Sequence, residues 1–589
     1  MHKLFLFWLI LFGAAPILAA IPPCDDHQGS VALIAPRILI KDKPSRFLVG
    51  NAIESLQSLT LVSESGASEE LAVTHLGGPP WGLSAEVPRL ASGVYRLEAV
   101  TATGERHCVQ TVTVHAGPPL QPVTRPPASA DWNLAHELLF ALWIEHLFDA
   151  PPDENLSFPT LEPVLRNARR NSLHDYLGQD EDSRIPATPD CADLPYYLRA
   201  YFAWKMGLPF SYRACSRGTA RAAPVCGIAT VHTGFMQHKT SAADFRALLR
   251  PLLDTVHSGS ARTALVAEAS DFYPVPLQRN ALWPGTVYAD PYGHVLMIAQ
   301  WLPQTVDRPG ILFAVDAQPD NSITRKRYWE GNFLYAHDLP GAGPGFKAFR
   351  PVTRDGQLPG NAVLATGNRY APYSIEQANH ATDAFHARIR QLVNPDGLQP
   401  RMALQTQLDA LIEQLQTRVT AVDNGTRYRN AHPRDLIPMP EGAAIFETIG
   451  PWEDYSTPSR DLRLMIALEV LSGLPAQVVI HPELFRLDGM LPELAREELE
   501  EQLRQALQAQ NIGYLRSDGS RWSLSLADIY ARRAQLEMAY NPNDCPEIRW
   551  GARRGTAEYQ TCRLQAPLEQ KKRMERYRSW FREGRRPSR

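Results

Sequence analysis

The chain has 589 residues, of which 44% are hydrophobic and 21% are charged, and its formal net charge at pH 7 is -3. This length is too great for a single hydrophobic core and predicts about three structural units. The near-neutral charge argues against nucleic acid as the main partner, because that function needs a strongly basic surface.

The first 20 residues form a segment of their own. Lys3 supplies a positive charge, residues 4–12 are an apolar run, and the small residues Ala19 and Ala20 end the segment. This order is typical of a cleaved secretory signal peptide. The alternative is an uncleaved membrane anchor, for which the apolar run is short, since a spanning helix needs about 20 apolar residues. We therefore expect a periplasmic or secreted protein.

The chain contains seven cysteines, which is an odd number. Exposed thiols in an oxidising compartment tend to form disulfides, so one cysteine should be left over. Proximity along the sequence favours the pairs Cys24–Cys108, Cys215–Cys226 and Cys545–Cys562. This pairing leaves Cys191 as the free thiol.

Short β-rich runs separated by Pro, Gly, Ser and Asp fill residues 30–114. Short strands separated at regular intervals by such turn residues are typical of a β-sandwich of the immunoglobulin-like type. We assign the sandwich to residues 21–116, with the Cys24–Cys108 disulfide joining its two ends. The proline-rich residues 117–130 should form a semi-rigid linker.

A helix is expected shortly after the linker. Apolar residues recur at helical spacing over residues 134–148, and Asp131 can cap the N-terminus of this helix. His136 and Glu137 begin a sequence like the zinc-protease motif, but the position four residues after His136 is Phe140, so the motif fails. The apolar stripe therefore indicates core packing, and no metal site is predicted.

Residues 189–210 place a single cysteine, Cys191, at the start of an aromatic-rich amphipathic helix that ends at Gly207. A thiol is a nucleophile as its thiolate, and the N–H groups and dipole of a helix N-terminus stabilise that anion. Cys191 is therefore the predicted nucleophile. Its own backbone N–H should stabilise an oxyanion, with Tyr176 as a further donor. The alternative is a buried, inert cysteine.

A cysteine nucleophile needs a histidine that takes its proton and a polar residue that orients the histidine. His294 is the candidate base, because it follows a turn and opens an apolar strand expected at residues 295–298. Asp316 is the candidate orienting residue, because it ends the next expected strand, which antiparallel pairing would bring back beside His294. Gln318 and Asp320 are the alternatives for this role.

At this point the residues resemble a known family. Asp190-Cys191 opens a helix that closes on the Gly-Leu-Pro sequence at 207–209, and residues 284–288 (PGTVY) precede Gly293-His294-Val295. This order resembles the papain-like NlpC-type cell-wall peptidases, whose Asp-Cys step carries the nucleophile and whose His-Val strand carries the base. The resemblance implies an α+β papain-like catalytic domain at residues 131–355, with Cys191 as nucleophile and His294 as base.

The chain departs from this family in places. Ala192-Asp193 stands where the family usually has Ser-Gly, and Thr286 replaces the family's aspartate. The layout with His294 on one strand and Asp316 on the next is similar to the transglutaminase-like branch of papain-like proteins, whose third catalytic residue is an aspartate at such a position. The resemblance covers residues 130–350 and leaves the choice between the two branches open.

Residues 356–589 are expected to form a mainly helical C-terminal region, because leucines recur there in three amphipathic stripes. Residues 571–589 hold nine basic and two acidic side chains. This excess favours contact with an anionic surface such as membrane lipid or cell-wall polymer. The alternative is a solvated terminal helix.

Together these features predict an exported, multidomain cysteine hydrolase with a Cys191-His294-Asp316 triad that cleaves amide bonds of envelope peptides. The peptide stems of peptidoglycan are the expected substrate. One alternative is a transglutaminase-like acyltransferase or protease. Another, from a different class, is a non-catalytic envelope scaffold that keeps a papain-like core. Neither a metal nor an organic cofactor is predicted.

Overall fold

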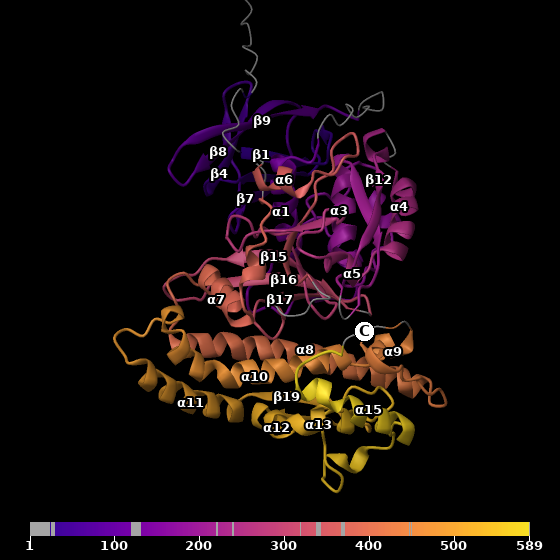
Figure 1. Cartoon of the computed structure of the whole chain (residues 1–589). Helices are drawn as coiled ribbons and strands as arrows, with labels where there is room; N and C mark the ends of the chain where they lie inside the picture. Colours follow the sequence, from indigo (N-terminus) through magenta and orange to yellow (C-terminus); the bar gives the residue numbers. More distant parts are fainter. Residues whose placement is uncertain are drawn as a thin grey trace, which may run out of the picture.

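The computed structural model describes Cys24 and residues 30–118, 131–219, 222–237, 241–318, 320–336, 343–366, 371–446, 448 and 450–587. The predicted signal peptide and most of the predicted linker lie outside these residues. The described chain has three parts in sequence order: N-terminal all-β sheets, a central mixed α and β part with a large antiparallel sheet, and a helical C-terminal part (Figure 1).

Two sheets make up the N-terminal part. The first has four strands in the order β1 (Ser30–Ala35), β3 (Ser45–Asn51), β7 (Trp81–Val87) and β6 (Val73–Leu76). The second has five strands in the order β2 (Leu39–Ile40), β9 (Arg106–His115), β8 (Gly93–Thr101), β4 (Leu56–Ser63) and β5 (Ser68–Glu70). Apolar side chains from both sheets, among them Phe47, Leu59 and Leu97, form one buried cluster. Strand β7 alternates the apolar residues Trp81, Leu83, Ala85 and Val87 with Gly82, Ser84 and Glu86, which is the period-two pattern typical of a strand.

Helix α1 (Leu134–Phe148) packs between the four-stranded sheet and the central part, in a core shared by both. Its N-cap is Asn133, whose side chain accepts a hydrogen bond from the backbone N–H of His136 at 3.0 Å. The predicted cap, Asp131, is therefore wrong. The Asp131 carboxylate instead accepts a hydrogen bond from the backbone N–H of Arg354 at 2.7 Å, which ties the segment before α1 to the loop at residue 354.

Gly77, just after β6, joins the N-terminal and central parts. Its N–H donates to Glu145 Oε1 at 2.7 Å, and an added Cβ would lie 2.3 Å from the backbone carbonyl oxygen of Trp301. A backbone oxygen cannot move aside unless its strand moves with it. Gly77→Ala should therefore lower the free energy of unfolding by about 1–3 kcal/mol. Thermal unfolding measures this loss. Gly117→Ala is the control, since its Cβ would meet nothing within 4 Å; equal melting temperatures for the two variants would contradict the prediction.

The central sheet has seven antiparallel strands in the order β10 (Ser157–Phe158), β17 (Ile323–Arg327), β16 (Ile311–Ala317), β15 (Val295–Leu302), β14 (Val287–Ala289), β18 (Gly345–Phe349) and β13 (Phe272–Pro274). Side chains alternate between its faces. Val295 and Met297 share a core with α1 and α3 (Asp193–Met206), whereas Leu296 and Ile298 share one with α7 (Thr382–Val393).

The other elements of the central part are α2 (Glu162–Leu165), the hairpin of β11 (Phe210–Cys215) and β12 (Cys226–His232), α4 (Ala242–Thr255), α5 (Ser258–Ala261) and α6 (Asn361–Thr366). Helix α7 also belongs to this part, because Phe385 and Ile389 are buried with side chains of the sheet. The packing of the central part therefore continues beyond the expected boundary at residue 355, as far as Val393.

Three long helices, α8 (Pro400–Ala431), α10 (Pro458–Ile480) and α11 (Pro492–Ala509), form the body of the C-terminal part (Figure 1). Shorter elements complete it: α9 (Pro451–Tyr455), the hairpin of β19 (Asn511–Leu515) and β20 (Arg521–Ser525), α12 (Leu526–Ala531), α13 (Arg533–Leu536), α14 (Pro546–Arg549) and α15 (Leu568–Arg582). The hairpin is the one departure from the expected helical structure among the named elements of this part.

Within the described residues, one helical stretch, Pro451–Ile480, is long and apolar enough to cross a membrane by length and composition. In the structure this stretch contains α10, whose residues Leu464, Leu468 and Leu471 are buried in the core of the C-terminal part. The core helix of a soluble unit passes the same test, and the buried contacts of α10 favour that interpretation.

The basic helix α15 is partly embedded in the same part. Met574 and Phe581 are buried in its core, and the guanidinium groups of Arg578 and Arg582 both pair with the carboxylate of Glu537. These ion pairs neutralise some of the positive charge that was expected to favour contact with an anionic surface.

The structure contains three disulfides, between the same pairs of cysteines that were expected: Cys24–Cys108, Cys215–Cys226 and Cys545–Cys562. Cys191 is a free thiol. Disulfides form and persist mainly in oxidising compartments. They therefore suggest an extracellular or otherwise oxidising location.

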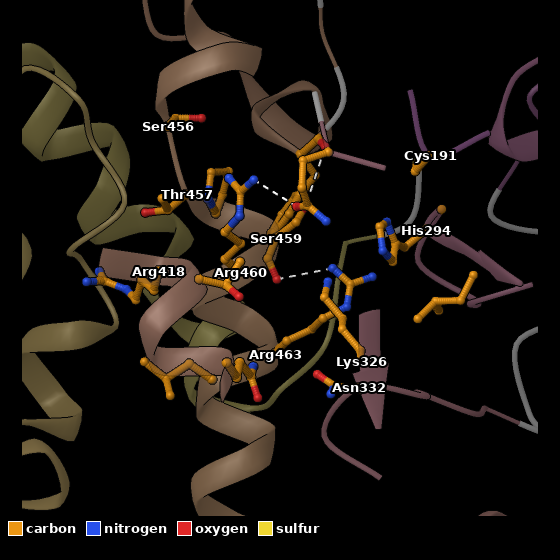
Figure 2. Close-up of a pocket in the computed structure, with 18 of the residues that line it drawn as sticks. Cys191, His294, Lys326, Asn332, Arg418, Ser456, Thr457, Ser459, Arg460 and Arg463 are labelled. Atoms are coloured by element: carbon orange, nitrogen blue, oxygen red, sulfur yellow. Dashed lines mark hydrogen bonds between the residues drawn. The ribbon is translucent and has the colours of Figure 1, made fainter. Parts of the chain in front are cut away.

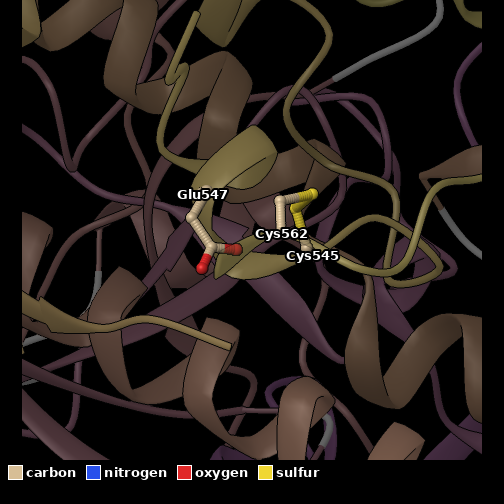
Figure 3. A group of neighbouring side chains, drawn as sticks. All are labelled: Cys545, Glu547 and Cys562. Atoms are coloured by element: carbon tan, nitrogen blue, oxygen red, sulfur yellow. A yellow bond between two sulfur atoms is a disulfide. The ribbon is translucent and has the colours of Figure 1, made fainter. Parts of the chain in front are cut away.

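Glu547 lies beside the Cys545–Cys562 disulfide, a grouping that superficially resembles a metal site (Figure 3). The two sulfur atoms are bonded to each other, so neither is a thiolate ligand. Both oxygens of the buried Glu547 carboxylate accept hydrogen bonds, from Ser517 and from Thr561. This group fixes loops of the C-terminal part to one another.

Candidate active site

A cavity of about 130 Å³ lies between the central part and the C-terminal helices. The central part lines it with Cys191, His294, Gln318 and Lys326, and the C-terminal part with Arg418, Arg460, Arg463 and Arg586. Figure 2 shows Cys191 and His294 on one side, across from the arginines of α8 and α10. The site is therefore built by two parts of the chain that are separate in sequence.

Cys191 lies in the turn immediately before α3, two residues earlier than the first helical residue, Asp193. The side chain of Asp190 accepts hydrogen bonds from the backbone N–H groups of Ala192 and Asp193, at 2.8 and 2.9 Å. These are the donors that a thiolate at the helix N-terminus would use. The backbone N–H of Val295, the residue that follows His294, is close enough to the Cys191 thiol to lower its pKa.

Burial, followed by the negative charge of Asp190, raises the pKa of the Cys191 thiol well above its ordinary value. The N–H of Val295 acts in the opposite direction but does not prevail. The sequence-based expectation of a thiolate stabilised by the helix is therefore wrong for the resting protein. Cys191 is held as a neutral thiol, so it must lose its proton during the reaction in order to act as a nucleophile.

His294 immediately precedes β15, and Asp316 lies in the neighbouring antiparallel strand β16. The Nε2 atom of His294 lies 2.6 Å from Oδ2 of Asp316. A carboxylate only accepts, so Nε2 carries the hydrogen and Nδ1 is left as the basic nitrogen. Burial lowers the pKa of His294 below its usual range in spite of the bond to Asp316. A neutral imidazole of this tautomer can take a proton from Cys191.

Asp316 is completely buried and is bonded on every side. Thr324 Oγ1 donates to Oδ1 at 2.7 Å, while Gln318 Nε2 donates to Oδ2 at 2.7 Å and Lys326 also pairs with Oδ2. Burial alone would raise the pKa of Asp316, but the charge of Lys326 and the bond from His294 outweigh it and the pKa falls below its ordinary value. The carboxylate therefore stays ionised and fixes the orientation of His294.

Gln318 and Asp320, the two alternatives for the residue that orients His294, make other contacts. Gln318 supports Asp316 rather than replacing it. Asp320 is exposed, and its carboxylate accepts hydrogen bonds from Ser322 and Asn424. Neither contacts His294 among the interactions of the described residues.

The structure does not place Tyr176 at this cavity. Its backbone carbonyl accepts a hydrogen bond from the N–H of Arg37 at 3.0 Å, and its ring packs against the core shared with the N-terminal sheet. Tyr176 is therefore too remote for the oxyanion role that the sequence suggested. Its position in the chain, 15 residues before Cys191, gave no indication that its loop contacts Arg37 in the N-terminal part.

No pattern in the sequence marks the polar residues that the neighbouring strand and the C-terminal helices contribute. Thr324 and Lys326 are two residues apart in β17, so both side chains emerge on the face that carries Asp316. Arg460 and Arg463 are three residues apart in the first turns of α10, which places them on one side of that helix. Arg460 donates to Gln318 Oε1 at 2.8 Å, and Arg463 pairs with Asp290 at 2.7 Å.

Comparison of the chain with models of protein families, with curated proteins and with solved structures finds no match. The assignment of a function therefore depends on the geometry of this site.

Proposed function

We propose that this chain is an exported cysteine hydrolase that cleaves amide bonds through an acyl-enzyme. The observation that carries the proposal is the arrangement of His294, held through Nε2 by a buried carboxylate, beside a free thiol in a cavity. A nucleophile, a base and a residue that orients the base are the three parts that acyl transfer requires.

The reaction begins when His294 Nδ1 takes the proton of Cys191 and the sulfur attacks the amide carbonyl carbon. The bond from carbon to nitrogen then breaks, the imidazolium gives its proton to the departing amine, and a thioester remains on Cys191. Water attacks this thioester with His294 again as base, which releases a carboxylic acid and restores the thiol. Asp316 stabilises the imidazolium in both halves of the reaction, and the steps require neither a metal nor an organic cofactor.

The proposed context is the bacterial cell envelope, with the peptide stems of peptidoglycan as substrate. The three disulfides support export, and the predicted signal peptide would direct it. In this proposal the central part is a papain-like catalytic domain of the NlpC type. The two N-terminal sheets form an immunoglobulin-like sandwich that helps to dock the enzyme on the polymer.

A transglutaminase-like acyltransferase or protease is the second candidate. Asp316, in the strand next to the one that His294 precedes, favours this branch, because its third catalytic residue is an aspartate at such a position. The chemistry is the same up to the thioester, which an amine rather than water then resolves.

Product analysis tests both candidates with one set of reagents. The full-length protein should cut purified muropeptides at one amide bond. In mass spectra, the masses of the two products should add up to the mass of the substrate plus one water molecule. A fluorescent amine supplied with glutamine-containing protein should be incorporated only if the second candidate is correct. If neither product depends on the protein, both enzymatic proposals fail and the scaffold remains.

The pH dependence of kcat/KM reports on His294. The imidazole acts as a base only in its neutral form, and burial lowers its pKa below 6.5. Activity should therefore persist as the pH falls through 6.5 and decline only below that value, where His294 becomes protonated. At high pH, the activity should decline only above pH 9, because the pKa of the Cys191 thiol is raised above its ordinary value. Rates measured from pH 4 to 10 on a cleaved muropeptide check this; an acidic decline centred at or above pH 6.5 would contradict it.

A further inference from the structure

The wall of the cavity opposite the thiol comes from the C-terminal part. Arg418 from α8 and Arg460 and Arg463 from α10 reach it (Figure 2). Arg586, from the segment after α15, also lines the cavity. The resemblance to papain-like enzymes ends near residue 350, so none of these arginines belongs to the machinery that it implies. Their position at the candidate site therefore needs a separate explanation.

Two of the arginines are already neutralised. Arg418 forms a buried pair with Asp461 through Nε and Nη2, at 2.7 and 2.9 Å, and Arg463 pairs with Asp290. Arg460 differs from them, because within the described chain its guanidinium forms no ion pair and its one hydrogen bond goes to the uncharged Gln318.

Donors of this wall remain unused. Arg460 Nε is buried and has no hydrogen-bond partner in the described part of the chain, and the same is true of Nη1 of Arg418. Arg418 is only 1% exposed, so water does not compensate its missing bond. Unsatisfied guanidinium N–H groups in a cavity favour an acceptor that enters from outside, and an anionic acceptor most strongly.

The acidic side chains of the cavity do not cancel this charge. Glu413 is paired with Arg327, at 2.8 Å, and Glu453 accepts the backbone N–H of Thr448. Burial raises the pKa of both carboxyl groups above the ordinary value. The positive end of α10 adds to the excess, because Thr457, its N-cap residue, lines the cavity and makes no capping bond with its side chain.

We propose that Arg460, together with Arg418 and the N-terminus of α10, binds a free carboxylate of the peptide substrate while Cys191 attacks a neighbouring amide. The inference rests on the proposed hydrolase function and assigns its substrate class, an acidic peptide. A planar guanidinium matches a carboxylate with two parallel hydrogen bonds, which gives orientation as well as affinity. Arg460 would so position the substrate against the triad from the opposite wall.

The same residue connects the substrate to the base. Arg460 donates to Gln318, Gln318 donates to Asp316, and Asp316 holds His294. A carboxylate bound at Arg460 is thus one hydrogen-bonded chain away from the residue that fixes the imidazole. Recognition of an acidic peptide and orientation of the base would use one continuous network of polar groups.

Binding to the full-length Cys191→Ala variant tests the proposal without turnover. The probes are purified muropeptides, native and with their carboxylates converted to carboxamides, measured by titration calorimetry. The native form should bind about tenfold or more tightly than the amidated form, because a charge-assisted pair of hydrogen bonds is lost on amidation. Equal affinities, or no measurable binding of either form, would overturn the proposal.

Variants at Arg460 assign the preference to this residue. In the Cys191→Ala background, Arg460→Gln should remove the preference for the native form and Arg460→Lys should keep part of it, because the charge remains. Arg504→Gln is the matched control: Arg504 lies on α11 with a 61% exposed side chain paired to Glu501. A preference that survives Arg460→Gln would overturn the role of Arg460.

The outcomes also separate this proposal from the hydrolase function. Thiol-dependent cleavage of native and amidated muropeptides at equal rates would leave the function in place and reject the carboxylate site. A preference for the native form in binding, without any product from the wild-type protein, would support the carboxylate site as a binding site and reject the hydrolase.

Discussion

Cys191→Ala should lower kcat/KM on a cleaved muropeptide by about 10⁴-fold or more, and His294→Ala by a similar factor. Both losses follow from one step, because the neutral thiol of Cys191 becomes a nucleophile only when His294 removes its proton. The double variant should therefore be no slower than the slower single variant. Initial rates of amide cleavage by the three variants and the wild type give the measurement.

Controls separate catalysis from folding. The far-UV circular dichroism and melting temperature of Cys191→Ala should match those of the wild type, since Cys191 forms no disulfide and lies in the turn before α3 rather than within the helix. His432→Ala, on the exposed end of α8, is the control for loss of a histidine and should retain full activity. Independent, multiplicative losses in the double variant would show that the two residues do not act in the same step.

The three candidate catalytic residues could be proposed from sequence because local patterns position each of them. Cys191 precedes a helix with clear ends, His294 opens a strand after a tight turn, and Asp316 lies near the end of the next strand. Antiparallel pairing of consecutive strands is the commonest arrangement, so the approach of Asp316 to His294 follows from short-range information. Their catalytic roles stay a proposal, but their proximity is a property of the fold.

The wall formed by the arginines could not be predicted in this way. Arg460 lies 144 residues after Asp316 and in a different hydrophobic core, and no periodic pattern links the two segments. In sequence, Arg460 and Arg463 are ordinary charged residues at the start of an apolar helix, where a solvent-exposed face is the usual interpretation. Only the packing of α10 against the central part brings them to the cavity.

The ionisation of Cys191 shows a second limit. The helix N-terminus was read correctly within two residues, yet Asp190 uses the donors that were assigned to a thiolate. Burial of the thiol, followed by the negative charge of Asp190, then decides the direction of the pKa shift. Local structure gave the position of the thiol, whereas tertiary packing set its charge.

The second large effect concerns the stability of the central part. Lys205 in α3 is completely buried, where its ammonium group pairs with the carboxylates of Glu181 and Asp182, the latter at 2.9 Å. Lys205→Met should preserve the aliphatic packing but leave two buried carboxylates without a cation. The expected loss is about 3–5 kcal/mol, the usual cost of removing one partner from a buried ion pair.

Urea unfolding followed by circular dichroism should show this loss as a transition at lower denaturant concentration, and hydrogen exchange in α3 should assign it to the central part. Lys572→Met provides the matched control, because Lys572 pairs with Glu569 on the surface of α15 and both side chains are more than half exposed. That variant should change the transition by less than about 1 kcal/mol. Similar transitions for the two lysine variants would contradict the prediction.

The effect of pH gives a further check on the Lys205 pair, with a definite sign. Burial tends to raise the pKa of Glu181, but the charge of Lys205 outweighs it, so the pKa in the folded protein lies below its ordinary value. A carboxyl group whose folded pKa is lowered contributes stability above its unfolded pKa of about 4.3 and loses that contribution as the pH falls through the folded value. In Lys205→Met this contribution is smaller, because the charge of Lys205, which lowers the pKa of Glu181 in the wild type, is gone. The difference in stability between the wild type and Lys205→Met should therefore be largest near neutral pH and should shrink below about pH 4.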